Sequence, residues 1–278
     1  MVDKKKWVSA ALAIIFFGVL CISAASKEEW RSGMMDADFI LQAHRGLSAH
    51  YPENTLAAFQ AAAETPEYQG IETDVQETLD GVLVLFHDSS LKKRTDAAGR
   101  IGDYTFEEIC QIHIDNASNS DLYPEERIPI LKDYLNICRK YDKIPYIELK
   151  SISLQGMEKL IQILKEEGWE ERRCVITTFV KEYIPQFRSL NECYPMEFMI
   201  DKDESYDMNE VIAFLGEYAN MGFRPNAYVI TKEEADICYQ NGIRVEAYGL
   251  KVGDRETYKY LKEIGVQGVT CNDYAGLK

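Results

Sequence analysis

Residues 70–76, GIETDVQ, and residues 146–150, YIELK, each place two charged side chains two positions apart on a short apolar run. The first pair is Glu72 and Asp74, and the second is Glu148 and Lys150. Because side chains alternate between the two faces of a strand, the members of each pair point the same way. A buried charge without a partner loses its hydration, so these four residues indicate a site for a metal ion, a phosphate or a reaction.

Outside these runs, short β-branched or apolar segments alternate with longer amphipathic stretches, which predicts parallel strands joined by crossover helices. We expect eight strands, at 39–43, 70–75, 145–149, 174–178, 196–200, 227–230, 243–248 and 266–271. We expect helices between most of them, at 54–64, 154–167, 180–191, 207–219, 231–240 and 254–264. The predicted fold is an α/β protein, a closed (β/α)8 TIM barrel, which normally needs about 250 residues.

One run interrupts the alternation. Only Asp80 and Gly81 separate residues 82–86 from the strand before them, and Asp-Gly is a favoured two-residue hairpin turn. This run therefore predicts a short antiparallel strand. Residues 88–144 depart furthest from the barrel pattern, and we expect them to form a small cap insertion with helices near 105–112 and 130–141.

The barrel prediction brings the charged residues to one rim, because active sites of this fold lie at the C-terminal ends of the strands. Three carboxylates there would supply the hard oxygen ligands that suit Ca²⁺ or Mg²⁺. They are Glu72, Asp74 and Glu148. The alternative is a set of internal salt bridges with Arg45 and Lys150, but two cations cannot neutralise three inward carboxylates.

Two of the four histidines, His44 and His87, lie beside charged residues at predicted strand ends. Hydrolysis of a phosphodiester needs a base for the nucleophile and an acid for the leaving alkoxide, and imidazole titrates near neutral pH. The pair is therefore a candidate for proton transfer, with a structural role as the alternative. Asn54 precedes the first helix, where we expect it to act as the N-cap.

Several segments resemble, in order and approximate spacing, the glycerophosphodiester phosphodiesterase family. They are AHRG at 43–46, PENTLAAF at 52–59, IETDVQETLDG at 71–81, LFHD at 85–88, IELK at 147–150 and GVQGVTCND at 265–273. The resemblance covers roughly residues 38–276 and implies a PLC-like phosphodiesterase TIM barrel. It implies that His44 and His87 are catalytic, that Glu72, Asp74 and Glu148 bind the metal, and that Arg45 and Lys150 hold the phosphate. Tyr248 stands where the family usually has tryptophan, as an aromatic wall of the substrate pocket.

The resemblance implies an enzyme, a phosphoric diester hydrolase that uses a divalent cation, Ca²⁺ or Mg²⁺. Its expected reaction is hydrolysis of glycerophosphodiesters to sn-glycerol 3-phosphate and an alcohol. One alternative is a lysophospholipase D-like activity on lipid phosphodiesters, although residues 115–127 of the cap are mostly polar. The other is a non-catalytic, membrane-tethered binder of glycerophosphate compounds, which would need no pair of histidines.

The N-terminus has the pattern of an export segment. Lys4, Lys5 and Lys6 precede an apolar stretch from Trp7 to Ala25, so residues 1–29 predict a signal peptide or membrane anchor, followed by one barrel domain at 38–278. We therefore expect an extracytoplasmic protein, either membrane-anchored or secreted. The formal net charge of −15 disfavours nucleic acid as a partner, and nothing in the sequence indicates an oligomeric state.

Overall fold

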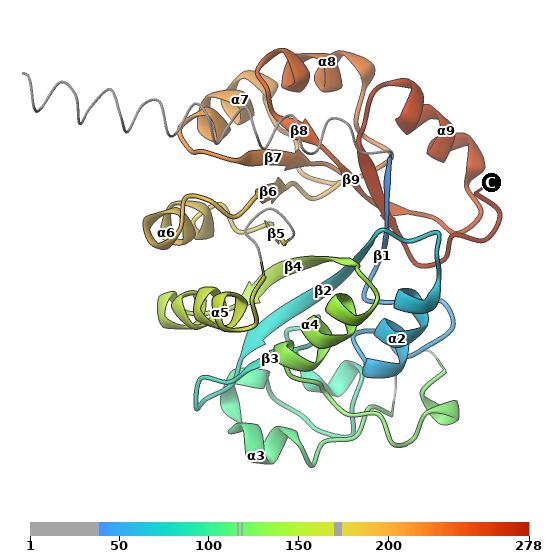
Figure 1. Ribbon diagram of the computed structural model, residues 1–278, viewed down its shortest axis with the longest axis vertical. Helices are drawn as coiled ribbons and strands as arrows, with labels where there is room; N and C mark the ends of the chain where they lie inside the picture. Colours follow the sequence, from blue (N-terminus) through green and yellow to red (C-terminus); the bar gives the residue numbers. More distant parts are fainter. Residues whose placement is uncertain (1–38, 116, 118, 170–173, 278) are drawn as a thin grey trace, which may run out of the picture. The chain divides into compact units, whose positions relative to one another are not determined.

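The computed structural model describes residues 39–115, 117, 119–169 and 174–277. Their strands form one sheet, with the order β8-β7-β6-β5-β4-β2-β1-β10-β9 and with β3 paired to β2 (Figure 1). The strands are β1 (Ile40–Ala43), β2 (Gly70–Glu77), β3 (Leu83–Leu85), β4 (Ile144–Ser151), β5 (Val175–Thr178), β6 (Met196–Met199), β7 (Met221–Arg224), β8 (Arg244–Val245), β9 (Ala247–Leu250) and β10 (Gly268–Cys271).

The two ends of this sheet are joined by a single stretch of chain. Only Glu246 separates β8 from β9; β8 pairs in parallel with β7, and β9 pairs in parallel with β10. The two short strands therefore occupy one position of the barrel, the one predicted at 243–248. The sheet is a parallel barrel with eight strand positions, which confirms the predicted fold class.

Helices lie around the outside of the barrel (Figure 1). Those of the described residues are α2 (Leu56–Glu64), α4 (Leu131–Lys140), α5 (Leu154–Glu166), α6 (Tyr183–Leu190), α7 (Met208–Gly216), α8 (Lys232–Gln240) and α9 (Arg255–Glu263), while the short α3 (Phe106–Ile109) lies in the insertion after β3. In α5, for example, Ser153 accepts a hydrogen bond from the Gly156 N–H as N-cap. The same helix buries an apolar stripe at positions three or four apart, Met157, Leu160, Ile161 and Leu164.

The barrel interior contains a buried polar network. Arg224 Nη1 donates to Glu197 Oε2 (2.6 Å) and Glu246 Oε2 (3.1 Å), and Arg244 Nε donates to Glu246 Oε1 (2.6 Å). The Arg224 guanidinium also lies over the Tyr146 ring, 5.2 Å from its centroid. Two cations thus face two carboxylates, and this balance is what makes burial of the four charges tolerable.

The strand predicted at 227–230 is wrong, because the strand at this barrel position is β7, at 221–224. AYVI carries the β-branched signal of a strand, whereas MGFR contains a glycine and the buried Arg224. Pro225 then removes a backbone donor, and the Asn226 side chain accepts from the Tyr228 N–H (3.1 Å). A turn therefore forms where the apolar run predicts a strand.

The antiparallel strand predicted after Asp80-Gly81 is confirmed, since Val75 faces Leu85 and Glu77 faces Leu83 across β2 and β3. The insertion after β3 has an apolar cluster separate from the barrel core, in which Leu91, Ile101, Ile109 and Ile114 pack with Val84 of β3 and with Phe86. The helix expected near 130–141 is α4, and its buried residues belong to the barrel core instead. The cap insertion is therefore joined to the barrel by the pairing of β3 with β2.

The predicted signal or anchor segment, residues 1–29, lies outside the described residues. Among the helices that the structure describes, none combines the length and the apolar character required to cross a bilayer.

Candidate active site

The loop after β1 sets the direction of two predicted site residues. Arg45 and Gly46 both have positive φ angles, +56° and +78°, so the chain turns sharply after His44. A Cβ atom on Gly46 would lie 2.6 Å from the backbone carbon of Ala58 in α2, so only glycine fits this close approach. The turn directs the Arg45 backbone N–H at Glu72 Oε2 (2.9 Å).

The three predicted metal ligands meet in the structure. Strands β2 and β4 are parallel neighbours, and Asp74 lies directly opposite Glu148 in their register. One carboxylate oxygen from each of Glu72, Asp74 and Glu148 lies within 4.8 Å of the others, and all three residues are buried. Glu72 Oε1 has no hydrogen-bond partner among the described residues. A buried carboxylate oxygen without a donor fits a site for a hard divalent cation.

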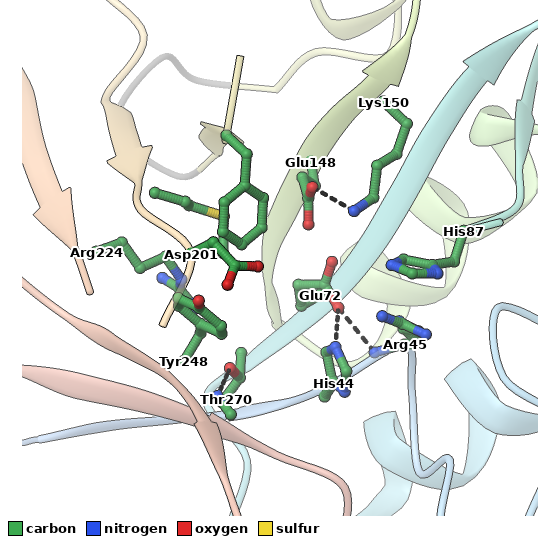
Figure 2. A pocket seen from close by; sticks show the side chains of 13 residues that line it. His44, Arg45, Glu72, His87, Glu148, Lys150, Asp201, Arg224, Tyr248 and Thr270 are labelled. Atoms are coloured by element: carbon green, nitrogen blue, oxygen red, sulfur yellow. Dashed lines mark hydrogen bonds and ion pairs between the residues drawn. The ribbon is translucent and has the colours of Figure 1, made fainter. Parts of the chain in front are cut away.

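Two cationic side chains border this carboxylate cluster on one side (Figure 2). Lys150 Nζ lies 2.5 Å from Glu148 Oε1 and 3.4 Å from Asp74 Oδ1. Arg45 Nε lies 3.2 Å from Asp74 Oδ2, while its Nη1 lies 2.9 Å from Glu53. Two positive charges thus meet three carboxylates of the cluster, and Arg45 is shared with a fourth. The excess negative charge favours a bound cation.

The pKa values of the three carboxyl groups diverge because their partners differ. Burial and the nearby Asp74 carboxylate raise the pKa of Glu148 to about 7 and that of Glu72 well above its usual range. Burial also acts to raise the pKa of Asp74, but Arg45 and Lys150 outweigh it and lower that pKa. The positive charges of Arg45 and Lys150 therefore stabilise the ionised form of Asp74. The ionised forms of Glu72 and Glu148 lack enough positive charge nearby, and a bound cation would stabilise them.

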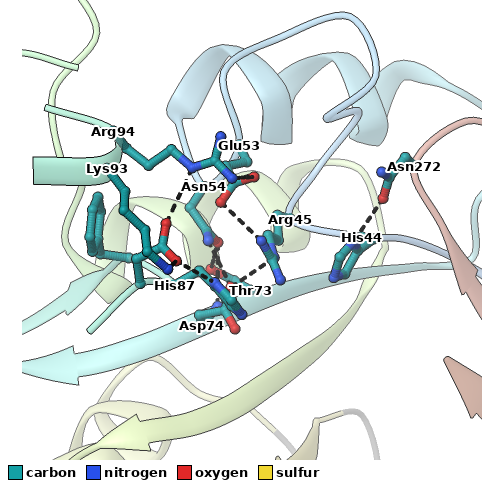
Figure 3. Close-up of polar contacts among 12 residues, drawn as sticks. His44, Arg45, Glu53, Asn54, Thr73, Asp74, His87, Lys93, Arg94 and Asn272 are labelled. Carbon is teal, nitrogen blue, oxygen red and sulfur yellow. Dashed lines mark hydrogen bonds and ion pairs between the residues drawn. The ribbon is translucent and has the colours of Figure 1, made fainter. Parts of the chain in front are cut away.

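Asn54 has a different role from the predicted one. The N-cap of α2 is Thr55, which accepts from the Ala58 N–H, so the N-cap prediction for Asn54 is wrong. Asn54 is buried with φ +56°, and its Nδ2 donates to Asp74 Oδ2 (2.8 Å) while its Oδ1 accepts from Thr73 Oγ1 (2.8 Å) (Figure 3). It therefore orients a metal-ligand candidate.

We expect Asn54→Gly to lower the free energy of unfolding by about 1–3 kcal/mol, because buried groups of Thr73 and Asp74 lose their partner. Metal affinity should fall by about 10–100-fold, since Asp74 is no longer held in place. Asn54→Ala should cost about 1 kcal/mol more, because alanine disfavours the left-handed backbone. Urea unfolding and metal titration of the two variants check this, and a glycine variant with unchanged stability and affinity would contradict it.

The two predicted catalytic histidines lie at the same rim, in different surroundings. His44 Nδ1 lies 2.6 Å from Asn272 Oδ1, and with this oxygen as acceptor Nδ1 carries the proton and Nε2 keeps its lone pair. That Nε2 lies 4.0 Å from Glu72 Oε2. Burial and the Arg45 charge lower the pKa of His44 to about 3, so its imidazole is neutral at physiological pH.

His87 follows β3, as the hairpin predicts, and burial lowers its pKa as well. Its Nδ1 lies 3.5 Å from Asp88 Oδ1. Asp88 in turn lies 2.9 Å from Lys93 Nζ and 3.2 Å from Arg94 Nε, and Arg94 also reaches Glu53 (Figure 3). These ion pairs tie the loop that carries His87 to the cap insertion and to the segment before α2.

A cavity of about 380 Å³ lies at the rim. Its lining includes all the predicted site residues except Asp74: His44, Arg45, Glu72, His87, Glu148, Lys150 and Tyr248. It also includes residues that sequence reasoning missed, namely Phe179, Met199, Asp201, Arg224, Gly249 and Thr270. Most of these stand at or just after the ends of later strands, and that position is the only signal that marks them.

Residues 44–275 match the sequence model of the Glycerophosphoryl diester phosphodiesterase family. The chain is 31% identical over 245 residues to a glycerophosphodiester phosphodiesterase of Caldanaerobacter subterraneus subsp. tengcongensis, covering 83% of this chain and 93% of that protein. It is 34% identical over 153 residues to glycerophosphodiester phosphodiesterase 1 of Mus musculus, covering 54% of this chain and 45% of that protein. A phosphodiesterase of Oleispira antarctica, solved with the product sn-glycerol-3-phosphate, has the same fold, with a TM-score of 0.74, 22% identity and coverage of 84% of this chain and 92% of that chain.

Proposed function

Because this chain belongs to the glycerophosphoryl diester phosphodiesterase family, we propose that it hydrolyses glycerophosphodiesters to sn-glycerol 3-phosphate and an alcohol. The observation that carries the proposal is a single barrel rim where three buried carboxylates lie beside two imidazoles and two cationic side chains. The product in the Oleispira antarctica structure supports the same product for this chain.

The phosphate would lie on the cavity side of the carboxylate cluster, within reach of the two cations. Arg45 and Lys150 are held by Asp74 and Glu148, so their positive charges are fixed before the substrate arrives. A divalent cation held by Glu72, Asp74 and Glu148 would supply charge that polarises a phosphoryl oxygen and favours deprotonation of the nucleophile. In a chain of net charge −15, this fixed local charge is what permits an anionic substrate to bind.

The two imidazoles would move the protons. Because Nδ1 of His44 faces Asn272 Oδ1, its Nε2 would carry the lone pair that accepts a proton from water or from a hydroxyl of the substrate glycerol. His87 comes from a different segment of chain at the same rim, so it can exchange protons at the same phosphate. The leaving alkoxide takes the proton from whichever imidazole then carries it.

The test is incubation of the full-length protein with a panel of glycerophosphodiesters, with and without a chelator, and detection of sn-glycerol 3-phosphate by a coupled dehydrogenase. We expect release of sn-glycerol 3-phosphate that depends on added metal. Binding of a diester without any release would contradict hydrolysis and favour a non-catalytic binder.

We also expect metal affinity to depend on pH near neutrality. The pKa of Glu148 in the metal-free protein is raised to about 7, so below this pH a proton occupies the group that the cation needs ionised. Affinity should fall by at least about tenfold for each pH unit below about 7, more where the raised pKa of Glu72 adds a second proton, and binding should release protons. Titration calorimetry in buffers of different ionisation enthalpy measures both quantities. Equal affinity at about pH 6 and about pH 8 would count against this account.

A further inference from the structure

The cavity has a second half, which the proposed catalytic groups do not use. This half is formed by Phe179, Met199, Asp201 and Tyr248. The Phe179 and Tyr248 rings meet edge to face, with centroids 5.3 Å apart, so they form a rigid aromatic wall. Figure 2 shows Asp201 and Tyr248 on the side of Glu72 and Glu148 away from Arg45 and Lys150.

Asp201 is the carboxylate of this second half. It follows β6 by two residues, is exposed, and points into the cavity (Figure 2). Its Oδ1 accepts from the Asp203 N–H (3.0 Å), which fixes the local turn. The neighbouring Lys202 pairs with Asp203 (2.5 Å), and within the described residues no cationic side chain forms an ion pair with Asp201.

Tyr248 holds the segment that carries Asp201. Its hydroxyl donates to the carbonyl oxygen of Ile200 (2.9 Å), the residue directly before Asp201. A tyrosine at this position therefore forms part of the wall and also anchors the carboxylate beside it. The hydroxyl group thus has a structural partner within the pocket.

Arg224 also lines the cavity, but its guanidinium is already paired with other side chains. Its Nη1 donates to Glu197 and Glu246, and its Nη2 donates to Gln42, all in the barrel interior. The cavity therefore has the cationic side chains of Arg45 and Lys150 at one end, where a bound divalent cation would add further positive charge, and the carboxylate of Asp201 at the other. A zwitterion with a phosphate at one end and a positive charge at the other matches this polarity.

We infer that Asp201, Phe179 and Tyr248 bind the alcohol portion of the diester and select alcohols that carry an ammonium group, an inference that rests on the proposed function. Lys150 Nζ lies over one face of the Phe179 ring, 5.5 Å from its centroid. The carboxylate attracts the positive charge, and the Tyr248 ring together with the other face of Phe179 favours a methylated ammonium through cation–π contact. A neutral alcohol can still donate a hydrogen bond to this carboxylate, but only an ammonium group also gains from its negative charge. The substrate class is thus a zwitterionic glycerophosphodiester.

The test compares two substrates of the same shape, glycerophosphocholine and its 3,3-dimethylbutyl analogue, in which carbon replaces the nitrogen, so that the headgroup is uncharged while the phosphate keeps its charge. We expect kcat/KM of the full-length protein to be about tenfold higher for glycerophosphocholine, from one partly exposed charge pair and one cation–π contact. Equal kcat/KM values for the two substrates would overturn the inference.

Variants then locate the effect. In Asp201→Asn the ratio of the two kcat/KM values should fall to about threefold, the share left by the cation–π contact, whereas in Asp203→Asn, a matched change in the same turn but outside the cavity, the ratio should stay as in the wild type. Phe179→Leu should lower the ratio independently, so the test does not depend on one variant folding. A ratio that is unchanged in Asp201→Asn, or rates that fall equally for both substrates, would overturn the inference.

Loss of the proposed function would look different from loss of this preference. If no diester in the panel releases sn-glycerol 3-phosphate, the proposed function fails, and the inference fails with it. If both substrates are hydrolysed without a preference for charge, only the assignment of Asp201 and its aromatic neighbours fails.

Discussion

Removal of divalent metal abolishes hydrolysis, and Glu72→Gln weakens metal binding by more than about 100-fold; these are the results we expect from the carboxylate cluster. Glu72 offers an oxygen, Oε1, that no donor in the described residues satisfies. Glutamine keeps the shape of the side chain but removes one unit of charge from the ligand set, and hard cations depend on that charge. Activity should return on addition of Ca²⁺ or Mg²⁺ to the chelated wild type.

The matched control is Glu77→Gln, on the same strand. Its Oε2 accepts from the Ser153 N–H (2.8 Å), a bond that a glutamine oxygen can still make, and it is outside the carboxylate cluster. We expect this variant to bind metal as the wild type does. Calorimetric titration of both variants, followed by rates at saturating metal, separates loss of affinity from loss of catalysis. Undiminished turnover in excess chelator would exclude the metal assignment.

The sequence is sufficient to predict the carboxylate cluster because a local rule governs it. Side chains two positions apart on a strand share a face, so Glu72 and Asp74 point together once β2 forms. Parallel pairing then places Asp74 opposite Glu148, which the alternation of strands and helices already implies. The same reasoning brings His44 to this rim, and the Asp-Gly turn brings His87.

Residues whose role depends on distant partners could not be predicted in this way. Arg224 can be buried in β7 because Glu197 and Glu246 balance its charge inside the barrel. The spacing of residues in the sequence does not reveal such a network. Asn54 looks like a helix cap until its left-handed backbone turns the side chain toward Asp74. Asp201 belongs to no motif, and only the folded barrel places it in the cavity.

Replacement of either His44 or His87 by alanine should lower kcat by about 10²–10⁴-fold, the usual cost of losing a positioned acid or base. KM should change much less, because Arg45 and Lys150, which we propose bind the phosphate, are unchanged. The double variant should be little worse than the single ones, since the two imidazoles act as a unit in one proton transfer cycle. Steady-state kinetics at saturating metal measures these effects.

His113→Ala provides the matched control, because His113 is exposed in the cap insertion and its Nε2 faces Arg127 (3.2 Å) rather than the cavity. We expect that variant to retain wild-type kcat. Stability should also distinguish the roles: His44→Ala loses one partly exposed contact with Asn272, worth about 1 kcal/mol, so its melting temperature should change little. A His44 or His87 variant that keeps its turnover but melts far earlier would make that histidine structural, and the proton transfer would then need another group at the rim.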